Sequence, residues 1–141
     1  MSFEIVEVRD ERASDFLRAH EREALRTFYG FPVVWHEQRH DLTAIEDGDV
    51  VGALRARIAA SLAEIESVVV DPAHRRRGVG RALLERTREL ASYYNCHKIT
   101  LEVPHGSTAQ AFFEACGYRE EAVLPQHIFK LDVAVMRTFL L

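Results

Sequence analysis

The chain has 141 residues, and its 48% hydrophobic and 28% charged content is typical of a folded globular domain. Its formal net charge of -4 argues against binding to bulk nucleic acid or to an anionic membrane. The two cysteines, Cys96 and Cys116, lack a CxxC spacing, and the chain has neither a signal-peptide pattern nor a long apolar run. We therefore expect one domain over residues 1–141 and a cytoplasmic protein.

The first half of the chain alternates between strand and helix patterns. Residues 3–8 (FEIVEV) alternate in polarity and predict a strand, and residues 14–28 predict an amphipathic helix. Residues 41–47 and 50–60 predict a hairpin, because a turn sequence around Gly48 separates them. A further strand is expected at residues 63–70, where Asp71-Pro72 ends it.

The second half predicts helix, strand, helix and a closing strand pair. A helix begins at Val79, and residues 98–103 (KITLEV) predict a half-buried strand. Ser107 is placed to cap a short helix that ends near Gly117. Two strands separated by Pro125 finish the chain. This order predicts an α/β fold with a mixed sheet of six or seven strands.

An arginine-rich loop lies between the strand at residues 63–70 and the helix that follows. Its sequence HRRRGVGR, residues 74–81, leads into a helix N-terminus, which is a favourable place for an anion. It is not an ATP-binding P-loop, because Arg81 and Ala82 stand where that motif needs Lys and Ser or Thr. A dinucleotide fingerprint is incomplete here, and a solvated basic turn is the plainer alternative.

Two segments together resemble a known family. Residues 68–84, VVVDPAHRRRGVGRALL, are similar to the acetyl-CoA motif of the GNAT superfamily of N-acetyltransferases, with Arg75, Gly78 and Gly80 in its fixed positions. Residues 109–118, AQAFFEACGY, resemble the helix and turn found downstream in that family. The resemblance implies a largely antiparallel sheet, flanked by helices and splayed at the acyl-CoA site. It also implies acetyl-CoA as co-substrate, with no metal.

The resemblance also implies which residues contact the co-substrate. Backbone amides of the loop would hold the pyrophosphate, and the end of the preceding strand would pair with the pantetheine arm. The Val68 amide would polarise the thioester carbonyl. The full set of expected contacts is Val68, Val69, Val70, Arg75, Arg76, Arg77, Gly78, Val79, Gly80, Arg81, Ser107 and Phe113.

The chemistry needs a base, because an amine attacks a thioester only when it is neutral. Glu64 lies eleven residues before Arg75, where several enzymes of this family have their base, and Glu66 is the alternative. A period of two predicts that both carboxylates share a face with Val68. The plainer reading is that both are exposed strand carboxylates. Phe113 stands where many members have a tyrosine acid, so the acid is open.

The expected acceptor is an amine of a small molecule or peptide, bound by a monomer or homodimer. An aromatic segment supplies candidates for the acceptor pocket, although a place in the core is the favoured alternative. These candidates are Phe28, Tyr29, Phe31 and Trp35.

The predicted function is N-acetyl transfer by direct attack in a ternary complex, without an acyl-cysteine at Cys116. One alternative is a catalytically silent module that binds acyl-CoA. Another follows from HEQRH at residues 36–40, which matches the HExxH pattern of zinc peptidases. Pro32 and two β-branched residues precede this match and a strand pattern follows it, so a helix is not expected there.

Overall fold

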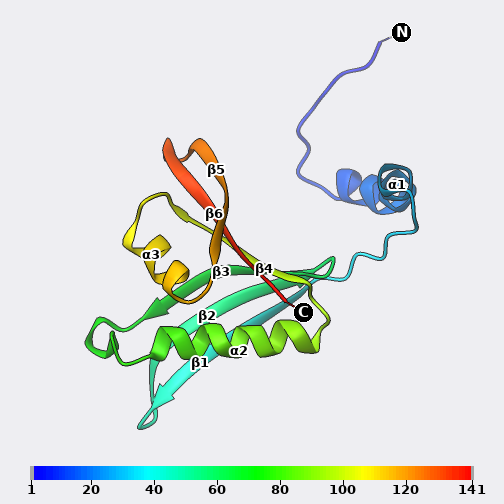
Figure 1. The fold of residues 1–141 in the computed structure, drawn as a ribbon. Helices are drawn as coiled ribbons and strands as arrows, with labels where there is room; N and C mark the ends of the chain where they lie inside the picture. Colours follow the sequence, from blue (N-terminus) through cyan, green and yellow to red (C-terminus); the bar gives the residue numbers. More distant parts are fainter. Residues whose placement is uncertain (1, 141) are drawn as a thin grey trace. The chain divides into compact units, whose positions relative to one another are not determined.

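The computed structural model describes residues 2–140, and the chain divides into two units, residues 1–35 and 36–141 (Figure 1). The single domain over residues 1–141 remains a prediction. The first unit contains α1 (Arg12–Tyr29). The second contains β1 (Gln38–Glu46), β2 (Asp49–Ala59), β3 (Leu62–Val70), a short 3-10 turn η1 (Pro72–His74), α2 (Val79–Tyr93), β4 (Lys98–Pro104), α3 (Thr108–Ala115), β5 (Arg119–Ile128) and β6 (Leu131–Phe139).

The first unit confirms the predicted helix and corrects the predicted strand. Helix α1 ends at Gly30, whose φ of 83° is left-handed and whose N–H donates to the Arg26 carbonyl over 2.8 Å. Residues 3–8 form no strand, so that prediction is wrong. A strand needs a hydrogen-bonded neighbour, and the first unit offers none among its described residues.

The second unit is built on a six-stranded sheet with the order β1-β2-β3-β4-β6-β5. Every neighbouring pair is antiparallel except β3 and β4, which are parallel. The predicted mixed, largely antiparallel sheet is therefore confirmed, at the lower of the two expected strand counts. The parallel pair is connected through α2, as a crossover between parallel strands requires.

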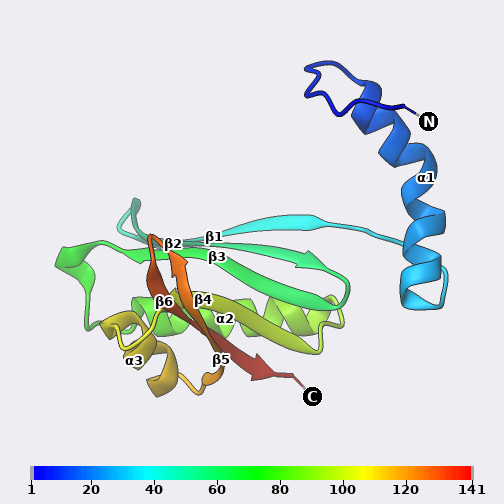
Figure 2. The same cartoon turned by 90° about the horizontal axis from the view of Figure 1, so that it is seen from above.

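The helices α2 and α3 share one core with the inner face of the sheet. Figure 2 shows α2 beneath β1, β2 and β3. Leu54, Ile99 and Met136 are at most 2% exposed and belong to the same buried cluster as Leu84 of α2 and Phe113 of α3. The opposite face of the sheet carries charged side chains on β1, β2 and β3, which form ion pairs across these strands.

The closing hairpin turns later than its sequence suggests. Its turn lies at Phe129 and Lys130, which have φ values of 51° and 62°, and not at Pro125. Pro125 instead lies within β5, an edge strand, where its missing N–H is tolerated. The register of the pair shifts between Leu124 and Ile128, and the Gln126 amide donates to the Asp132 carboxylate over 3.0 Å.

The start of α3 provides a test of local stability. The Ser107 hydroxyl accepts a hydrogen bond from the backbone N–H of Gln110 over 3.1 Å, which satisfies one free donor of the first turn. Ser107→Ala is therefore expected to lower the free energy of unfolding by about 1 kcal/mol in a urea titration. Ser92→Ala, at an exposed position of α2, is the control and should change it by less than about 0.5 kcal/mol. An equal effect of both variants would contradict the capping role.

Candidate functional site

The sheet opens between β3 and β4. The two strands pair only at Leu62 with Lys98, Ala63 with Ile99, and Glu64 with Thr100, although both continue well beyond. The predicted splay of the sheet is therefore confirmed. Residues of β3 beyond Glu64 present a backbone edge toward this gap that is not paired with β4.

A bulge at Glu66 accompanies the opening. On β2, Ala56 pairs with Ile65 and the preceding residue, Arg55, pairs with Ser67, so Glu66 is one residue extra. Such an extra residue shifts the alternation of side chains along the strand. The Val68 side chain consequently packs toward the core, opposite Leu54, whereas Glu64 points to the other face. The expectation that the two glutamates share a face with Val68 is wrong for this reason.

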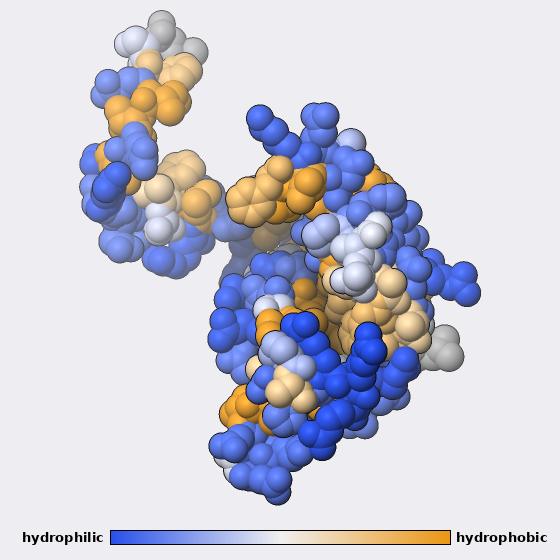
Figure 3. Space-filling model, turned by 90° about the vertical axis from the view of Figure 1, so that its left-hand side faces the viewer, coloured by the Kyte–Doolittle hydropathy of each residue, from blue (hydrophilic) through white to orange (hydrophobic). Residues whose placement is uncertain are grey.

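A cavity of about 680 Å³ lies between the end of β3, the loop before α2, and α3. Figure 3 shows the side of the second unit that contains these segments, hollowed and with apolar surface in and beside the hollow. Ten of the twelve residues expected to contact the co-substrate line this cavity: Val68, Val69, Val70, Arg75, Arg76, Gly78, Val79, Gly80, Arg81 and Phe113.

The N-terminus of α2 faces this cavity with free backbone donors. Gly78 caps the helix in a left-handed conformation, φ 83°, and no side chain caps it. The first amide to bond within the helix is that of Ala82, which donates to the Gly78 carbonyl over 2.9 Å. The amides of residues 79–81 therefore remain available to an anion, which the helix dipole also favours.

The other two expected contact residues are engaged elsewhere. The Arg77 guanidinium donates to Glu46 over 2.9 Å, outside the cavity, and Ser107 caps α3. Sequence reasoning also missed four residues that line the cavity: His74, Thr108, Ala109 and Phe112. The sequence does offer a way to predict Phe112. It lies three residues after Ala109 of the helix motif, and therefore on the same helix face.

Gly80 allows α2 and α3 to approach each other beside the cavity. A Cβ atom at Gly80 would lie 3.0 Å from Cζ of Phe112 and 3.6 Å from a methyl group of Val70. The first separation is tighter than an ordinary contact, so a larger residue would force the ring to move. Phe112 is 37% exposed. Its ring forms part of the wall of the cavity.

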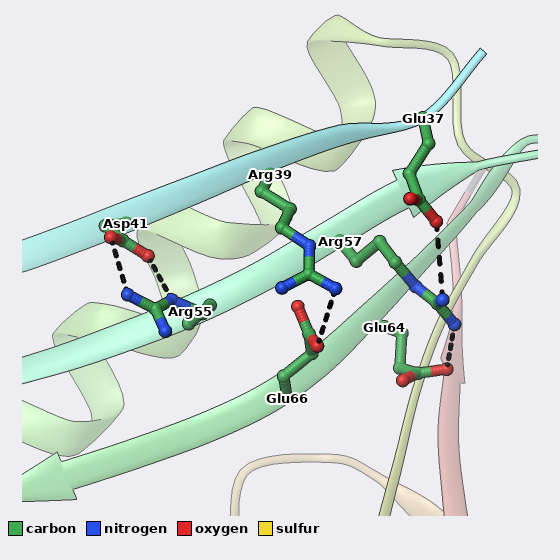
Figure 4. A network of polar contacts seen from close by, with 7 residues as sticks. All are labelled: Glu37, Arg39, Asp41, Arg55, Arg57, Glu64 and Glu66. Carbon is green, nitrogen blue, oxygen red and sulfur yellow. Dashed lines mark hydrogen bonds and ion pairs between the residues drawn. The ribbon is translucent and has the colours of Figure 1, made fainter. Parts of the chain in front are cut away.

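The candidate bases lie in a network of charges on the face of the sheet away from α2 (Figure 4). The Arg57 guanidinium donates to Glu64 over 3.1 Å and to Glu37 over 3.3 Å. The charge of Glu64, together with this hydrogen bond, raises the pKa of Arg57 above its usual value. Glu66 is held less closely, with 3.7 Å between its carboxylate and Arg39. Both carboxylates therefore have a basic neighbour, which lies on β2 for Glu64 and on β1 for Glu66.

A second cavity, of about 420 Å³, lies beside the two glutamates at the point where β3 and β4 part. It is lined by Glu64, Ile65, Glu66, Thr100, Leu101, Glu102 and Val135. Three of these seven side chains are carboxylates, and they come from both sides of the gap. The larger, apolar cavity with the free α2 amides therefore lies further along β3. The smaller, acidic cavity lies where β3 and β4 begin to separate.

The HEQRH segment is not helical. His36 and Glu37 precede β1, and His40 lies within it, 3.0 Å from the Gln38 side chain. The zinc-peptidase pattern needs a helix to bring its two imidazoles onto one face, so this alternative loses its structural basis. Across residues 2–140, no cluster of three potential His, Cys, Asp or Glu ligands is present. No helix in this part of the chain is long and apolar enough to cross a membrane.

The four aromatic residues of the expected acceptor pocket belong to the first unit. Rings of Phe28 and Tyr29 lie 5.3 Å apart, and those of Tyr29 and Phe31 lie 6.2 Å apart. Helix α1 has no buried residue, so the favoured alternative of a place in the core finds no support in this unit. A role of these aromatics and of Trp35 in acceptor binding remains a prediction.

Comparison with known proteins decides the family. The sequence profile of the Acetyltransferase (GNAT) family matches residues 5–118. The chain belongs to this family. Protein YdhI of Bacillus subtilis (strain 168) is 31% identical to this GNAT protein over 86 residues, 60% of the chain and 52% of YdhI. The match thus spans about half the length of that relative.

Solved structures share the GNAT fold of this chain. An acetyltransferase from Bacillus cereus ATCC 14579 superposes with a TM-score of 0.75 at 17% identity, covering 97% of this chain and 98% of the other. The ribosomal-protein-S18-alanine N-acetyltransferase of Escherichia coli gives 0.65 at 20% identity, over 91% and 89%. A protein from Bacillus anthracis str. Ames, solved in complex with acetyl coenzyme A, gives 0.68 at 20% identity, over 72% and 62%. At these identities the likeness concerns the fold.

This GNAT chain has no tyrosine hydroxyl at position 113. Phe113 is buried and packs edge-on against Tyr118, with ring centroids 5.4 Å apart. Burial raises the pKa of Tyr118 to about 12, and Tyr118 does not line the cavity. A phenol with so high a pKa is a weak donor to a thiolate, whose conjugate acid has a pKa near 8.5. Neither aromatic residue therefore suits the role of general acid.

Proposed function

We propose that this GNAT protein transfers the acetyl group of acetyl-CoA to a primary amine, by direct attack in a ternary complex. The observation that carries the proposal is the parting of β3 from β4, which has a large cavity with free helix amides along it and carboxylates at its start. A thioester at this gap would be open to an amine from the carboxylate side. If β3 and β4 were paired along their whole length, they would separate the thioester from the amine.

The proposed binding roles follow from the groups that line the larger cavity. The amides of Val79, Gly80 and Arg81 would receive the pyrophosphate, with Arg75 and Arg76 adding positive charge. Backbone groups at the end of β3 would hydrogen-bond the pantetheine arm. The Val68 amide would donate to the thioester oxygen as negative charge develops there. Residues Val69, Val70, Gly78 and Phe113 would supply the apolar and close-fitting walls.

The proposed reaction needs one proton acceptor at the start. Glu64 would take a proton from the ammonium group of the acceptor, directly or through water, and leave a neutral amine. The amine nitrogen forms a bond to the thioester carbon, and the carbon–sulfur bond breaks. The nitrogen passes its second proton to solvent water as the amide forms, and this balances the proton that the CoA thiolate takes from water. CoA departs as a thiolate, which takes a proton from water, so no acid is required from residue 113.

The proposal is tested by incubating the protein with acetyl-CoA and a panel of primary amines. Release of free CoA thiol is followed with a thiol reagent, and the acceptor is examined by mass spectrometry for one added acetyl group. The expected result is thiol release that depends on the amine, with an acetylated product. Binding of acetyl-CoA without turnover of any amine would favour the silent acyl-CoA-binding alternative. Lack of acetyl-CoA binding would contradict both.

Direct attack makes a prediction about Cys116. This thiol lies at the end of α3, and burial raises its pKa, so it is a poor nucleophile. Cys116→Ala is expected to leave kcat within about twofold, since no acyl-enzyme forms. The measurement is steady-state acetylation, together with the mass of the protein after exposure to acetyl-CoA alone. A loss of more than a hundredfold, with an acetylated wild-type protein, would contradict direct transfer.

A further inference from the structure

We infer that the acceptor is an amine carrying a second positive charge, and that Glu102 binds this charge in the smaller cavity. The inference rests on the proposed function and names the substrate class of the same site. It is carried by the position of the cavity, by the pairing of charges around it, and by the exposure of Glu102.

The cavity lies where an acceptor has to approach. Its walls come from β3 at residues 64–66 and from β4 at residues 100–102, which are the segments where the two strands separate. The larger cavity begins two residues further along β3, at Val68. An amine held between the two strands would therefore lie next to the segment of β3 that is proposed to hold the thioester. The volume of about 420 Å³ is ample for a small linear amine.

The arginines of β1 and β2 on this face are engaged with carboxylates. Arg57 pairs with Glu37 and Glu64, and Arg39 pairs with Glu66, as Figure 4 shows. Arg55, the third arginine of the network, donates to Asp41 over 2.8 Å. Glu102 lies across the gap from this network and takes no part in it. In this cavity, the carboxylates of Glu64 and Glu66 on β3 are thus paired with arginines, whereas the carboxylate of Glu102 on β4 is not.

Glu102 is the carboxylate that is left for a ligand. Its closest basic group is the His127 ring, 3.9 Å away, which is too long for a hydrogen bond. The Glu102 side chain is 51% exposed, and its strand neighbour on β6 is Val135, which offers no charge. An ammonium group of the acceptor would supply the missing partner. A carboxylate on the acceptor would instead be repelled.

The two glutamates would then have different tasks. Glu64 would accept the proton of the reacting amine, while Glu102 would bind the second ammonium across the gap. Because Glu102 is half exposed, water and salt weaken its attraction, and we expect discrimination of about tenfold rather than thousands. An ion pair of this kind acts in binding, so the effect belongs to KM more than to kcat.

The test compares three acceptors with the same four-carbon chain: butylamine, putrescine and γ-aminobutyrate. The ratio of kcat/KM for putrescine to that for butylamine is expected to be about ten or more, and γ-aminobutyrate should be poorer than butylamine. The ratio should fall as salt is raised, because the second charge is bound electrostatically. A ratio near one in low salt, with butylamine still acetylated, would overturn the inference and leave the proposed function standing.

The variant Glu102→Gln assigns the effect to one side chain. It is expected to bring the putrescine-to-butylamine ratio close to one, through a rise of about tenfold in KM for putrescine. Glu121→Gln is the matched control, since Glu121 pairs with Lys98 outside the cavity and should leave the ratio unchanged. A ratio that survives in Glu102→Gln would overturn the assignment. Failure of all three amines to accept acetyl, while another amine of the panel is acetylated, would overturn the inference and leave the proposed function standing.

Discussion

Glu64→Gln is expected to lower kcat for amine acetylation by about 100- to 1,000-fold at neutral pH, with the affinity for acetyl-CoA unchanged. Glutamine has nearly the shape of glutamate and retains an oxygen that can accept the 3.1 Å hydrogen bond from Arg57. It cannot accept a proton from the ammonium group of the acceptor. The measurement is thiol release at saturating acetyl-CoA, with acetyl-CoA affinity measured separately by calorimetry.

Two further variants identify the base. Glu66→Gln is the competing candidate, and on the proposed mechanism its effect on kcat should be at least tenfold smaller than that of Glu64→Gln. Glu89→Gln, at an exposed position of α2, should have no effect. For Glu64→Gln the rate should rise steeply with pH, because only the fraction of acceptor that is already neutral can react. A larger loss from Glu66→Gln would transfer the role of base to the bulge residue.

Gly80→Val is expected to weaken acetyl-CoA binding by about 10- to 100-fold, or roughly 1.4 to 3 kcal/mol. A Cβ atom here already lies 3.0 Å from the Phe112 ring, and the two methyl groups of valine would extend into the wall of the cavity. The ring would have to move, and the backbone would no longer approach the pyrophosphate closely. Titration of acetyl-CoA by calorimetry gives the affinity directly.

Position 82 of the same helix provides the matched control for Gly80→Val. Ala82→Val introduces the same side chain into the same helix, at an exposed position that does not line the larger cavity. Replacing alanine by valine has a helix-propensity cost that Gly80→Val does not have, so Ala82→Val is the more demanding change for the helix itself. Its affinity for acetyl-CoA should nevertheless remain within about twofold of wild type. Equal losses in the two variants would show that a strained helix, and not a filled cavity, explains the effect of Gly80→Val.

The sequence predicts the loop before α2 and the start of that helix well, because the information for them is local. The spacing of Arg75, Gly78 and Gly80 fixes a loop and a helix start within seven residues, and the structure shows both. Ser107 was also correctly identified as a cap. Its role as a cap, however, leaves it outside the cavity, and Arg77 turns to Glu46, a residue distant in the sequence. The spacing of residues along the sequence does not predict a contact between two such distant residues.

The bulge at Glu66 shows where the sequence falls short. The segment AEIESVVV alternates plausibly as a regular strand, and nothing in it indicates which residue is extra. A regular strand would place Glu64 and Val68 on one face, and the bulge makes that prediction wrong. The prediction of a strand at residues 3–8 is wrong for a related reason. A polarity pattern does not supply the neighbouring strand with which a strand must pair.

The central claim is that acetyl-CoA binds along β3 and the N-terminus of α2, with its thioester at the gap between β3 and β4. A crystal structure of the protein with CoA tests this claim most directly. We expect pyrophosphate oxygens within hydrogen-bonding distance of the amides of residues 79–81, and the thiol end between Val68 and Glu64. CoA bound away from the α2 N-terminus, or with its thiol directed away from the gap, would contradict the account.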